Sequence, residues 1–288
     1  MLFQYAYDAA QGYHGEEIET ATHDFTAGTY LKDGGKNTCK FHRFFRPVDG
    51  VHEPLSLFHE DWERISEPDR EKLPHLNLRE ATECTRSMIV NPFKTDRTVA
   101  DKRRMFSYEG ALSISQAGMD EFLAKCAGIM RVTRLSILDF GCGQGMALKR
   151  FLDNGVCDAE MSVGVTLPHA REFADGVENN IVLANLMHLA AKHRFDILFE
   201  IYGGILHHPL NRLINGIYGM LHALSFVREG GMIASECLNR YNVYGEERLE
   251  KMGILERVPD LMVKRAKRVV RKPTVEEVYE LLMRNSRR

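Results

Sequence analysis

The 288-residue sequence predicts an α/β fold with a doubly wound, mostly parallel sheet in its second half. From residue 135 onward, short continuous apolar runs alternate with helical patterns, and the first run ends in a glycine-rich turn. Continuous apolar strands between helices are typical of a parallel sheet that helices cover on both faces. The composition, with 44% hydrophobic and 27% charged residues, is that of a globular protein with an ordinary core.

The predicted helices and strands follow one another in chain order. A helix is expected within residues 106–130, because apolar residues recur there at helical spacing: Met119, Phe122, Leu123 and Cys126. Strands are expected at residues 135–140, 161–166, 180–184, 195–201 and 232–236. Helices are expected between them at residues 146–152, near residues 168–175, and from residue 209 to residue 226. Gly230 and Gly231 are expected to break the chain before the last strand.

Residues 1–105 are expected to form an N-terminal extension of mixed, irregular structure, which precedes a domain of residues 106–288. Prolines interrupt the extension repeatedly, and helices are expected in it only at residues 55–65 and 80–88. The extension also contains possible metal ligands, namely Cys39, His42, His52 and His59. Their spacing fits no standard zinc finger, so no metal site is predicted.

The cysteines and the charge indicate the setting of the protein. Six cysteines are widely spread without a Cys-x-x-Cys pair, which is typical of free thiols in a reducing compartment. No apolar run approaches the roughly 18–20 residues that a membrane span requires, and the N-terminus does not resemble a signal peptide. A soluble, cytoplasmic protein is therefore expected. The net charge of −2 does not indicate nucleic acid or an anionic membrane as a partner.

The C-terminal segment is basic, with ten Lys and Arg against five Asp and Glu in residues 256–288. A solvated helix face is the preferred interpretation of the basic residues between 264 and 272, ahead of a phosphate-binding or nuclear-address role. Thr274 and Glu277 form a capping-box pattern that predicts a helix start, and the apolar face of that helix follows. It consists of Val278, Leu281 and Leu282.

The sharpest motif is the Asp-Phe-Gly-Cys-Gly-Gln-Gly run of residues 139–145, where a predicted strand turns into a predicted helix. Glycines lack a Cβ atom, so a ligand can lie against the main chain there, beyond the carboxyl end of the strand. The spacing is Gly-x-Gly-x-Gly. It differs from the Gly-x-Gly-x-x-Gly of dinucleotide enzymes, which disfavours a nicotinamide-dependent oxidoreductase.

Residues 137–145 resemble the first motif of class I S-adenosylmethionine (SAM) dependent methyltransferases, which have a Rossmann-like fold. Residues 195–209 resemble the fourth strand of that family and its Leu-His-His loop, and residues 221–233 resemble its glycine-glycine lead into the fifth strand. Order and spacing both match over residues 106–236. In the family, a helix and two further strands normally follow, so these strands are missing here, rebuilt from the N-terminal region, or hidden in residues 261–271.

The resemblance implies SAM as the cofactor, with its methionine moiety held by the glycine turn. Thr166 stands where the family usually has a ribose-binding acid, and a hydroxyl bonds more weakly than a carboxylate. Asn185 or His188 stands where the third strand commonly ends in an acid near the adenine amine. The implied cofactor-binding residues are Asp139, Gly141, Cys142, Gly143, Gln144, Gly145, Thr166, Leu167, Asn185, Leu186 and Glu200.

Methyl transfer from a sulfonium is an in-line displacement, so the protein mainly positions the acceptor and removes a proton where needed. The candidate catalytic residues follow the fourth strand and are Glu200, Tyr202, His207 and His208. Histidine is the base best tuned to neutral pH. The alternative for the two histidines is packing at the entry of a helix.

The acceptor is expected to be an O, N or C atom of a small molecule or of a protein side chain. The chain has no Asn-Pro-Pro-Tyr loop, which disfavours resemblance to the methyltransferases that act on amino groups of nucleobases and glutamine. It also lacks the Lys-Asp-Lys-Glu set of the ribose methyltransferases, since Lys251 is the only lysine between Asp196 and Arg257. A nucleic-acid acceptor is therefore disfavoured. The N-terminal extension would cover the acceptor pocket and exclude water. The alternative is a catalytically inactive, methyltransferase-like scaffold that acts through protein–protein interaction, since fold does not determine function.

Overall fold

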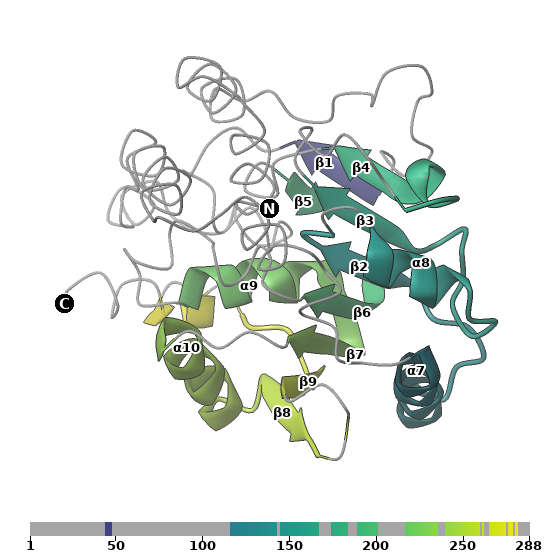
Figure 1. Cartoon of the computed structure of the whole chain (residues 1–288). Helices are drawn as coiled ribbons and strands as arrows, with labels where there is room; N and C mark the ends of the chain where they lie inside the picture. Colours follow the sequence, from purple (N-terminus) through teal and green to yellow (C-terminus); the bar gives the residue numbers. More distant parts are fainter. Residues whose placement is uncertain are drawn as a thin grey trace, which may run out of the picture.

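The computed structural model describes residues 44–47, 116–142, 145–166, 174–183, 189–200, 217–235, 240–259, 261, 265–274, 276–278 and 280–281. Within these residues, seven strands form one sheet in the order β4-β3-β2-β6-β7-β9-β8 (Figure 1). The strands are β2 (Ile137–Phe140), β3 (Val163–Thr166), β4 (Ile181–Leu183), β6 (Phe195–Glu200), β7 (Val227–Ser235), β8 (Leu255–Val258) and β9 (Arg265–Val269). The first five are parallel to one another, and β9 is antiparallel to both of its neighbours. The predicted doubly wound, mostly parallel α/β fold is confirmed.

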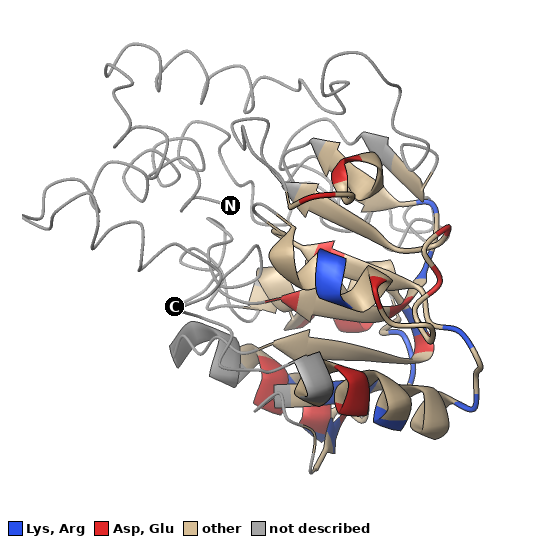
Figure 2. Cartoon of the chain, turned by 45° about the vertical axis from the view of Figure 1, so that its right-hand side comes forward, with Lys and Arg blue, Asp and Glu red and all other residues tan. Residues whose placement is uncertain are grey.

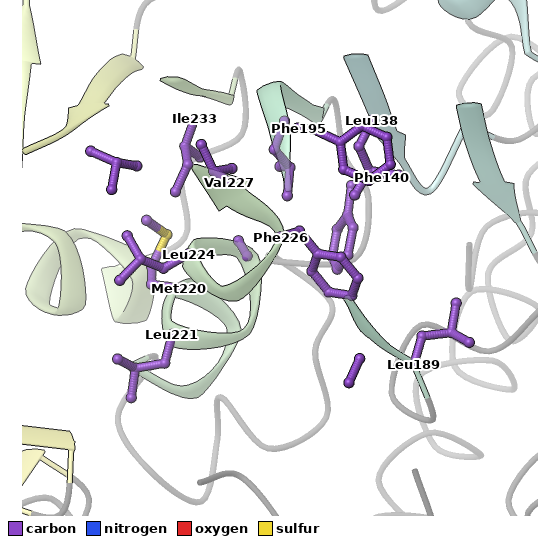
Figure 3. Close-up of a cluster of buried hydrophobic side chains, with 14 of the residues drawn as sticks. Leu138, Phe140, Leu189, Phe195, Met220, Leu221, Leu224, Phe226, Val227 and Ile233 are labelled. Atoms are coloured by element: carbon purple, nitrogen blue, oxygen red, sulfur yellow. The ribbon is translucent and has the colours of Figure 1, made fainter. Parts of the chain in front are cut away.

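Helices cover both faces of the sheet (Figure 1). Helices α7 (Gln116–Met130) and α8 (Met146–Leu152) lie on one face, and α9 (Ile217–Phe226) and α10 (Arg240–Lys251) lie on the other. Neighbouring residues of a strand point to opposite faces, so Ile137 contacts the α7 cluster and Leu138 contacts the α9 cluster. Figure 3 shows the second cluster, in which Phe226 at the end of α9 lies beside Phe140 of β2, with ring centroids 5.6 Å apart.

Helix α7 confirms the helical spacing expected within residues 106–130. Its four predicted apolar residues are all buried: Met119, Phe122, Leu123 and Cys126. The expected helix near residues 168–175 lies mostly outside the described residues, and its last two positions, Ala174 and Asp175, are not helical. The helix expected from residue 209 is described from Ile217 onward. The helices expected at 55–65 and 80–88 lie outside the described residues.

Gly230 and Gly231 lie inside strand β7, so the expected chain break before the fifth strand is wrong. The register between β6 and β7 shifts, because Phe195 pairs with Val227 whereas Ile197 pairs with Met232. Gly230 has φ 76°, which favours glycine, and a Cβ atom at Gly231 would lie 2.7 Å from the carbonyl oxygen of Asp196. The glycines therefore lie in an irregular part of β7 that shifts its register against β6 without ending the strand.

Strands β8 and β9 are the two further strands that the resemblance implies. The expectation that these strands are hidden in residues 261–271 is confirmed for β9, which lies inside that range. Strand β8 lies just before it. The preference for a solvated helix face is wrong, because residues 265–269 form a strand. Lys267 of this strand is buried and forms ion pairs with Glu246 and Glu250 of α10.

The predicted capping box after β9 is confirmed. The backbone N–H of Thr274 donates to Glu277 Oε2 at 2.8 Å, and the N–H of Glu277 donates to Thr274 Oγ1 at 3.2 Å. Val278 and Leu281 are buried as expected, whereas Leu282 lies outside the described residues. Reciprocal bonds of this kind satisfy donors that the first helical turn leaves without partners.

A small antiparallel pair was not predicted. Strand β1 (Phe45–Pro47) pairs with β5 (Leu189–Ala191), and Phe44 and Phe45 are buried in the α9 cluster. This short piece of the expected N-terminal extension thus contributes to the core of the sheet domain. Among the described residues, no helix is long and apolar enough to cross a membrane. The described cysteines, Cys126, Cys142 and Cys157, are free thiols as predicted.

Candidate active site

The strand order reverses between β2 and β6, and this reversal locates the candidate site. From β2 the chain builds outward through β3 and β4, and it then returns to place β6 on the other side of β2. Open α/β sheets bind ligands beyond the carboxyl ends of the strands at such a switch point. Described residues at or just beyond these ends include Asp139, Gly141, Cys142, Glu200 and Ser235.

The glycine turn closes over the end of β2 and leads into α8. The backbone N–H groups of Gly141 and Cys142 both donate to the carbonyl oxygen of Val165 at 3.0 Å, and that of Gly145 donates to the carbonyl oxygen of Cys142 at 2.8 Å. Gly141 has φ 91° and Gly145 has φ 79°. These left-handed conformations favour glycine, so this part of the predicted motif is required by the backbone itself.

Gly164 of β3 was not among the predicted site residues, although the turn rests on it. A Cβ atom at Gly164 would lie 2.6 Å from Cys142 Sγ and 2.9 Å from Cys142 Cβ. A glycine inside a strand often marks a close approach of another chain segment, and that signal was present in the sequence. Gly164 therefore sets the position of the glycine turn above the sheet.

Asp139 is buried beneath the turn, with 1% of its surface exposed. Neither of its carboxylate oxygens has a hydrogen-bond partner among the residues that the structure describes. Burial raises the pKa of Asp139 to about 7. The negative charge of Glu200 also raises this pKa, whereas the nearby backbone N–H of Leu148 lowers it without reaching full hydrogen-bond geometry. Buried polar groups in proteins normally have partners, so an unpartnered carboxylate at a switch point indicates a place for a ligand with donors or positive charge.

Glu200 ends strand β6 and is the second buried acid of the site. The hydroxyl of Ser235, at the end of the neighbouring strand β7, donates to Glu200 Oε2 at 2.9 Å. Asp139 pairs in register with Phe199, so Glu200 lies one residue beyond that pair. The switch point thus brings together two buried carboxyl groups from adjacent strands.

The remaining predicted site residues stay predictions. Thr166 is the last residue of β3, at the same edge of the sheet. The others lie outside the described residues: Gly143, Gln144, Leu167, Asn185, Leu186, Tyr202, His207 and His208. The possible ligands Cys39, His42, His52 and His59 also lie outside them, and the described residues contain no group of His, Cys, Asp and Glu suited to a metal ion.

Asp196 belongs to the fourth-strand motif but lies at the opposite end of the sheet. Its Oδ2 accepts hydrogen bonds from the backbone N–H of Ser136 at 2.7 Å and from the Ser136 hydroxyl at 2.8 Å. Arg228 forms an ion pair with its Oδ1. These contacts tie together the amino ends of β2, β6 and β7, so Asp196 is structural.

Four features together define the fold: the five parallel strands, the reversal between β2 and β6, the two added strands and the glycine turn. The chain has the Rossmann-like fold of class I SAM-dependent methyltransferases. The edge of the sheet at which open α/β folds bind ligands carries Asp139 and Glu200 in this chain.

Comparisons with known proteins find solved methyltransferase structures that are similar to most of the chain. No family profile and no curated protein matches the sequence. The chain is similar to the plantazolicin methyltransferase BpumL, solved with a pentazolic desmethylPZN analogue and S-adenosylhomocysteine (SAH), with 16% identity over 77% of this chain and 73% of that one and a TM-score of 0.35.

Two further structures show comparable likeness. Coclaurine N-methyltransferase, bound to N-methylheliamine and SAH, is 12% identical, and the match covers 81% of this chain but only 54% of that one, with a TM-score of 0.30. An O-methyltransferase family protein from Burkholderia thailandensis is 14% identical over 90% of this chain and 84% of that one, with a TM-score of 0.35. At these low scores, the likenesses do not distinguish one activity from another, and the assignment of the fold rests on strand order and the glycine turn.

Proposed function

We propose that the chain is a SAM-dependent methyltransferase that modifies an O, N or C atom of a small molecule or of a protein side chain. One observation carries the proposal. A turn with two left-handed glycines, Gly141 and Gly145, closes over the buried and unpartnered carboxylate of Asp139 at the switch point. The residues fit SAM, because its methionine ammonium group supplies the donors and the positive charge that Asp139 lacks.

The chain's own residues would perform the binding and orientation. The glycine turn and Asp139 would hold the methionine moiety, and Thr166, Leu167, Asn185 and Leu186 are proposed to contact the rest of the cofactor. When bound, SAM supplies a methyl group on a sulfonium. Glu200, held by Ser235, lies at the same edge and would contact the cofactor ammonium or the acceptor.

The acceptor would be positioned after strand β6, where Tyr202, His207 and His208 follow Glu200 in the chain. One of the two histidines is proposed as the base that removes a proton from an O–H or N–H acceptor, since its ordinary pKa lies near neutrality. Residues 1–105 are proposed to cover this pocket. The free thiols are consistent with the proposed cytoplasmic location.

A small molecule or protein side chain suits the charge distribution better than a nucleic acid. In the view of Figure 2, acidic and basic residues of the described part of the chain alternate along helices and loops. Several basic residues of the C-terminal segment are engaged internally, because Lys267 pairs with α10 and Arg271 forms a two-point ion pair with Glu277 at 2.7 Å. Phosphate-binding proteins instead present clustered Lys and Arg on one face.

The first test is calorimetric titration of the full chain with SAM and with SAH. Binding of both in the micromolar range is expected, followed by transfer of label from methyl-radiolabelled SAM to small molecules or proteins of a cell lysate. Failure of both ligands to bind would overturn the proposal and leave the scaffold function. Binding without transfer to any fraction would remove the catalytic part of the proposal alone.

A further inference from the structure

The glycine turn is anchored from the α9 side of the sheet by the residue that precedes it. Phe140 is the last residue of β2 and is followed directly by Gly141. Its side chain is fully buried in the α9 cluster, with its ring centroid 5.6 Å from that of Phe226 and 5.8 Å from that of His222. Aromatic rings at these separations attract one another. The position of the turn therefore depends on the end of α9 as well as on Gly164.

Phe45 of the N-terminal segment contacts the same group of rings. It is 1% exposed, and its ring centroid lies 6.1 Å from that of Phe226 and 6.2 Å from that of Phe195. Phe226 contacts both Phe45 and Phe140. These three phenylalanines form a continuous series of ring contacts from β1 to the residue that enters the glycine turn.

A second series of contacts joins β1 to the same ring. Pro47 of β1 pairs with Leu189 of β5. His222 Nε2 donates a hydrogen bond to the carbonyl oxygen of Leu189 at 2.9 Å, because a carbonyl oxygen can only accept. The ring of His222 lies nearly perpendicular to that of Phe140, at 86°. Strand β1 thus contacts Phe140 through α9 along two routes.

Close packing makes these contacts a means of setting the position of the turn. Protein interiors have few voids, so a change of shape at one buried side chain displaces its neighbours. Loss of the Phe45 ring would leave space beside Phe226, and a shift of Phe226 would release Phe140. Because Phe140 and Gly141 are adjacent in the chain, such a shift would change where the glycine turn lies.

On the basis of the proposed methyltransferase function, we infer that Phe45 is a positioning residue for the cofactor: acting through Phe226 on Phe140, it holds the glycine turn in the position that binds SAM. Residues 44–47 belong to the segment that is proposed to cover the acceptor pocket. This short part of the segment therefore also supports the cofactor site, and removal of the segment would weaken SAM binding.

The test measures SAM dissociation constants by calorimetry on the full chain. Phe45→Leu, which keeps an apolar side chain but removes the ring, is expected to weaken SAM binding about fivefold. Phe226→Leu should weaken it at least as much. The double variant should bind no more weakly than Phe226→Leu alone, because Phe45 acts through Phe226.

Leu255→Ala is the matched control for loss of core packing. Leu255 of β8 is buried in the α9 cluster, and strands β6, β7 and β9 separate β8 from β2. This substitution should lower the melting temperature, because it also leaves a cavity in the core. The affinity for SAM should stay within about twofold, since distant sites are usually independent.

Hydrogen exchange without ligand provides a measurement that does not depend on SAM. The backbone N–H groups of Gly141 and Cys142 donate to the carbonyl oxygen of Val165, and that of Ile197 in β6 donates to the carbonyl oxygen of Ser136. In Phe45→Leu, exchange at the turn should accelerate at least about threefold relative to exchange at Ile197, because the turn opens locally. Leu255→Ala should leave this ratio unchanged.

Unchanged SAM affinity in a folded Phe45→Leu protein, or additive losses in the double variant, would overturn the inference while leaving the proposed function intact. A loss of affinity in Leu255→Ala equal to that in Phe45→Leu would also overturn it, because the effect would then be general destabilisation. Thermal melting verifies folding, and Phe45→Met decides the question if Phe45→Leu does not fold. If SAM does not bind to the unmodified chain, the proposed function fails and the cofactor role of Phe45 with it, whereas the exchange ratio still tests whether Phe45 positions the turn.

Discussion

Gly164 and Cys142 are in contact across β3 and the glycine turn, with no space for a side chain at position 164. A Cβ atom there would lie 2.6 Å from Cys142 Sγ. We expect Gly164→Ala to displace the turn, to reduce the affinity for SAM at least about tenfold and to lower the free energy of unfolding by about 1–3 kcal/mol, as overpacking usually does. Calorimetry and urea denaturation measure the two effects.

Gly128→Ala provides the control for this substitution. Gly128 lies in helix α7, and a Cβ atom there would meet no atom within 4 Å. Alanine favours the helix over glycine by up to about 1 kcal/mol, so this variant should be neutral or more stable and should bind SAM normally. Unchanged SAM binding by Gly164→Ala would show that the turn does not depend on this contact.

Asp139 makes the stability of the unliganded protein depend on pH. Its pKa is raised from 3.8 to about 7 in the folded state, so the folded protein holds this proton more tightly than the unfolded chain does. The stabilising contribution is complete below pH 4 and is lost as the pH rises through 7. We expect the unliganded protein to lose about 2–3 kcal/mol relative to Asp139→Asn between pH 5 and pH 8, because the amide stays neutral.

Urea denaturation of both proteins at the two pH values, without ligand, measures this difference. Asp139→Asn is thus expected to stabilise the unliganded protein at pH 8 and to weaken SAM binding. Functional sites often trade stability for activity in this way. A difference between the two proteins that does not change with pH would mean that Asp139 titrates in its ordinary range.

Asp196, unlike Asp139, is an acid with hydrogen-bond and ion-pair partners that lies far from the candidate site. Asp196→Ala removes the acceptor of two hydrogen bonds from Ser136 and of the ion pair with Arg228. We expect it to lower the free energy of unfolding by about 1–3 kcal/mol, because partly buried donors lose their partner. The affinity of the folded protein for SAM should remain within about twofold, since changes at distant sites are usually independent. A loss of affinity comparable to that of Asp139→Asn would show that Asp196 acts on the site.

The sheet was predictable where strands are continuous apolar runs. Ile137–Phe140 and Phe195–Glu200 are almost entirely buried, so their composition alone indicates a covered parallel sheet. Strand β9 was harder, because its sequence Arg-Ala-Lys-Arg-Val suggests a solvated segment. Lys267 is buried in β9 and forms ion pairs with Glu246 and Glu250 of helix α10, and no local sequence pattern shows such partners.

The candidate site was predictable where its geometry is local. Gly141 and Gly145 lie in one short turn, and their left-handed backbone follows from the spacing of the motif. The bond between Ser235 and Glu200 joins residues 35 positions apart, and it depends on the register of β6 against β7. The irregular stretch of β7 that contains Gly230 and Gly231 shifts that register, and the sequence indicated only a break there.

Lys272 ties the C-terminal segment to the end of helix α9. Its ammonium nitrogen lies against the carbonyl oxygens of Leu224 and Val227 and donates to both, and its backbone N–H donates to Glu229 Oε1 at 3.0 Å. We expect Lys272→Met to lower the free energy of unfolding by about 1–3 kcal/mol, because these buried carbonyls lose a donor. Lys251→Met, at an exposed position of α10, is the matched control and should have little effect.

The pH dependence of the destabilisation by Lys272→Met distinguishes the loss of a hydrogen-bond donor from the loss of packing. Burial lowers the pKa of Lys272 from 10.5 to about 7, and the positive charge of Arg194 lowers it further. Between these values the unfolded chain binds one more proton than the folded protein, so the contribution of Lys272 to stability increases from pH 7 toward pH 10. The destabilisation by Lys272→Met, measured by urea denaturation, should therefore be larger at pH 9.5 than at pH 6. An equal loss at both values would mean that the carbonyls at the end of α9 keep Lys272 charged despite its burial.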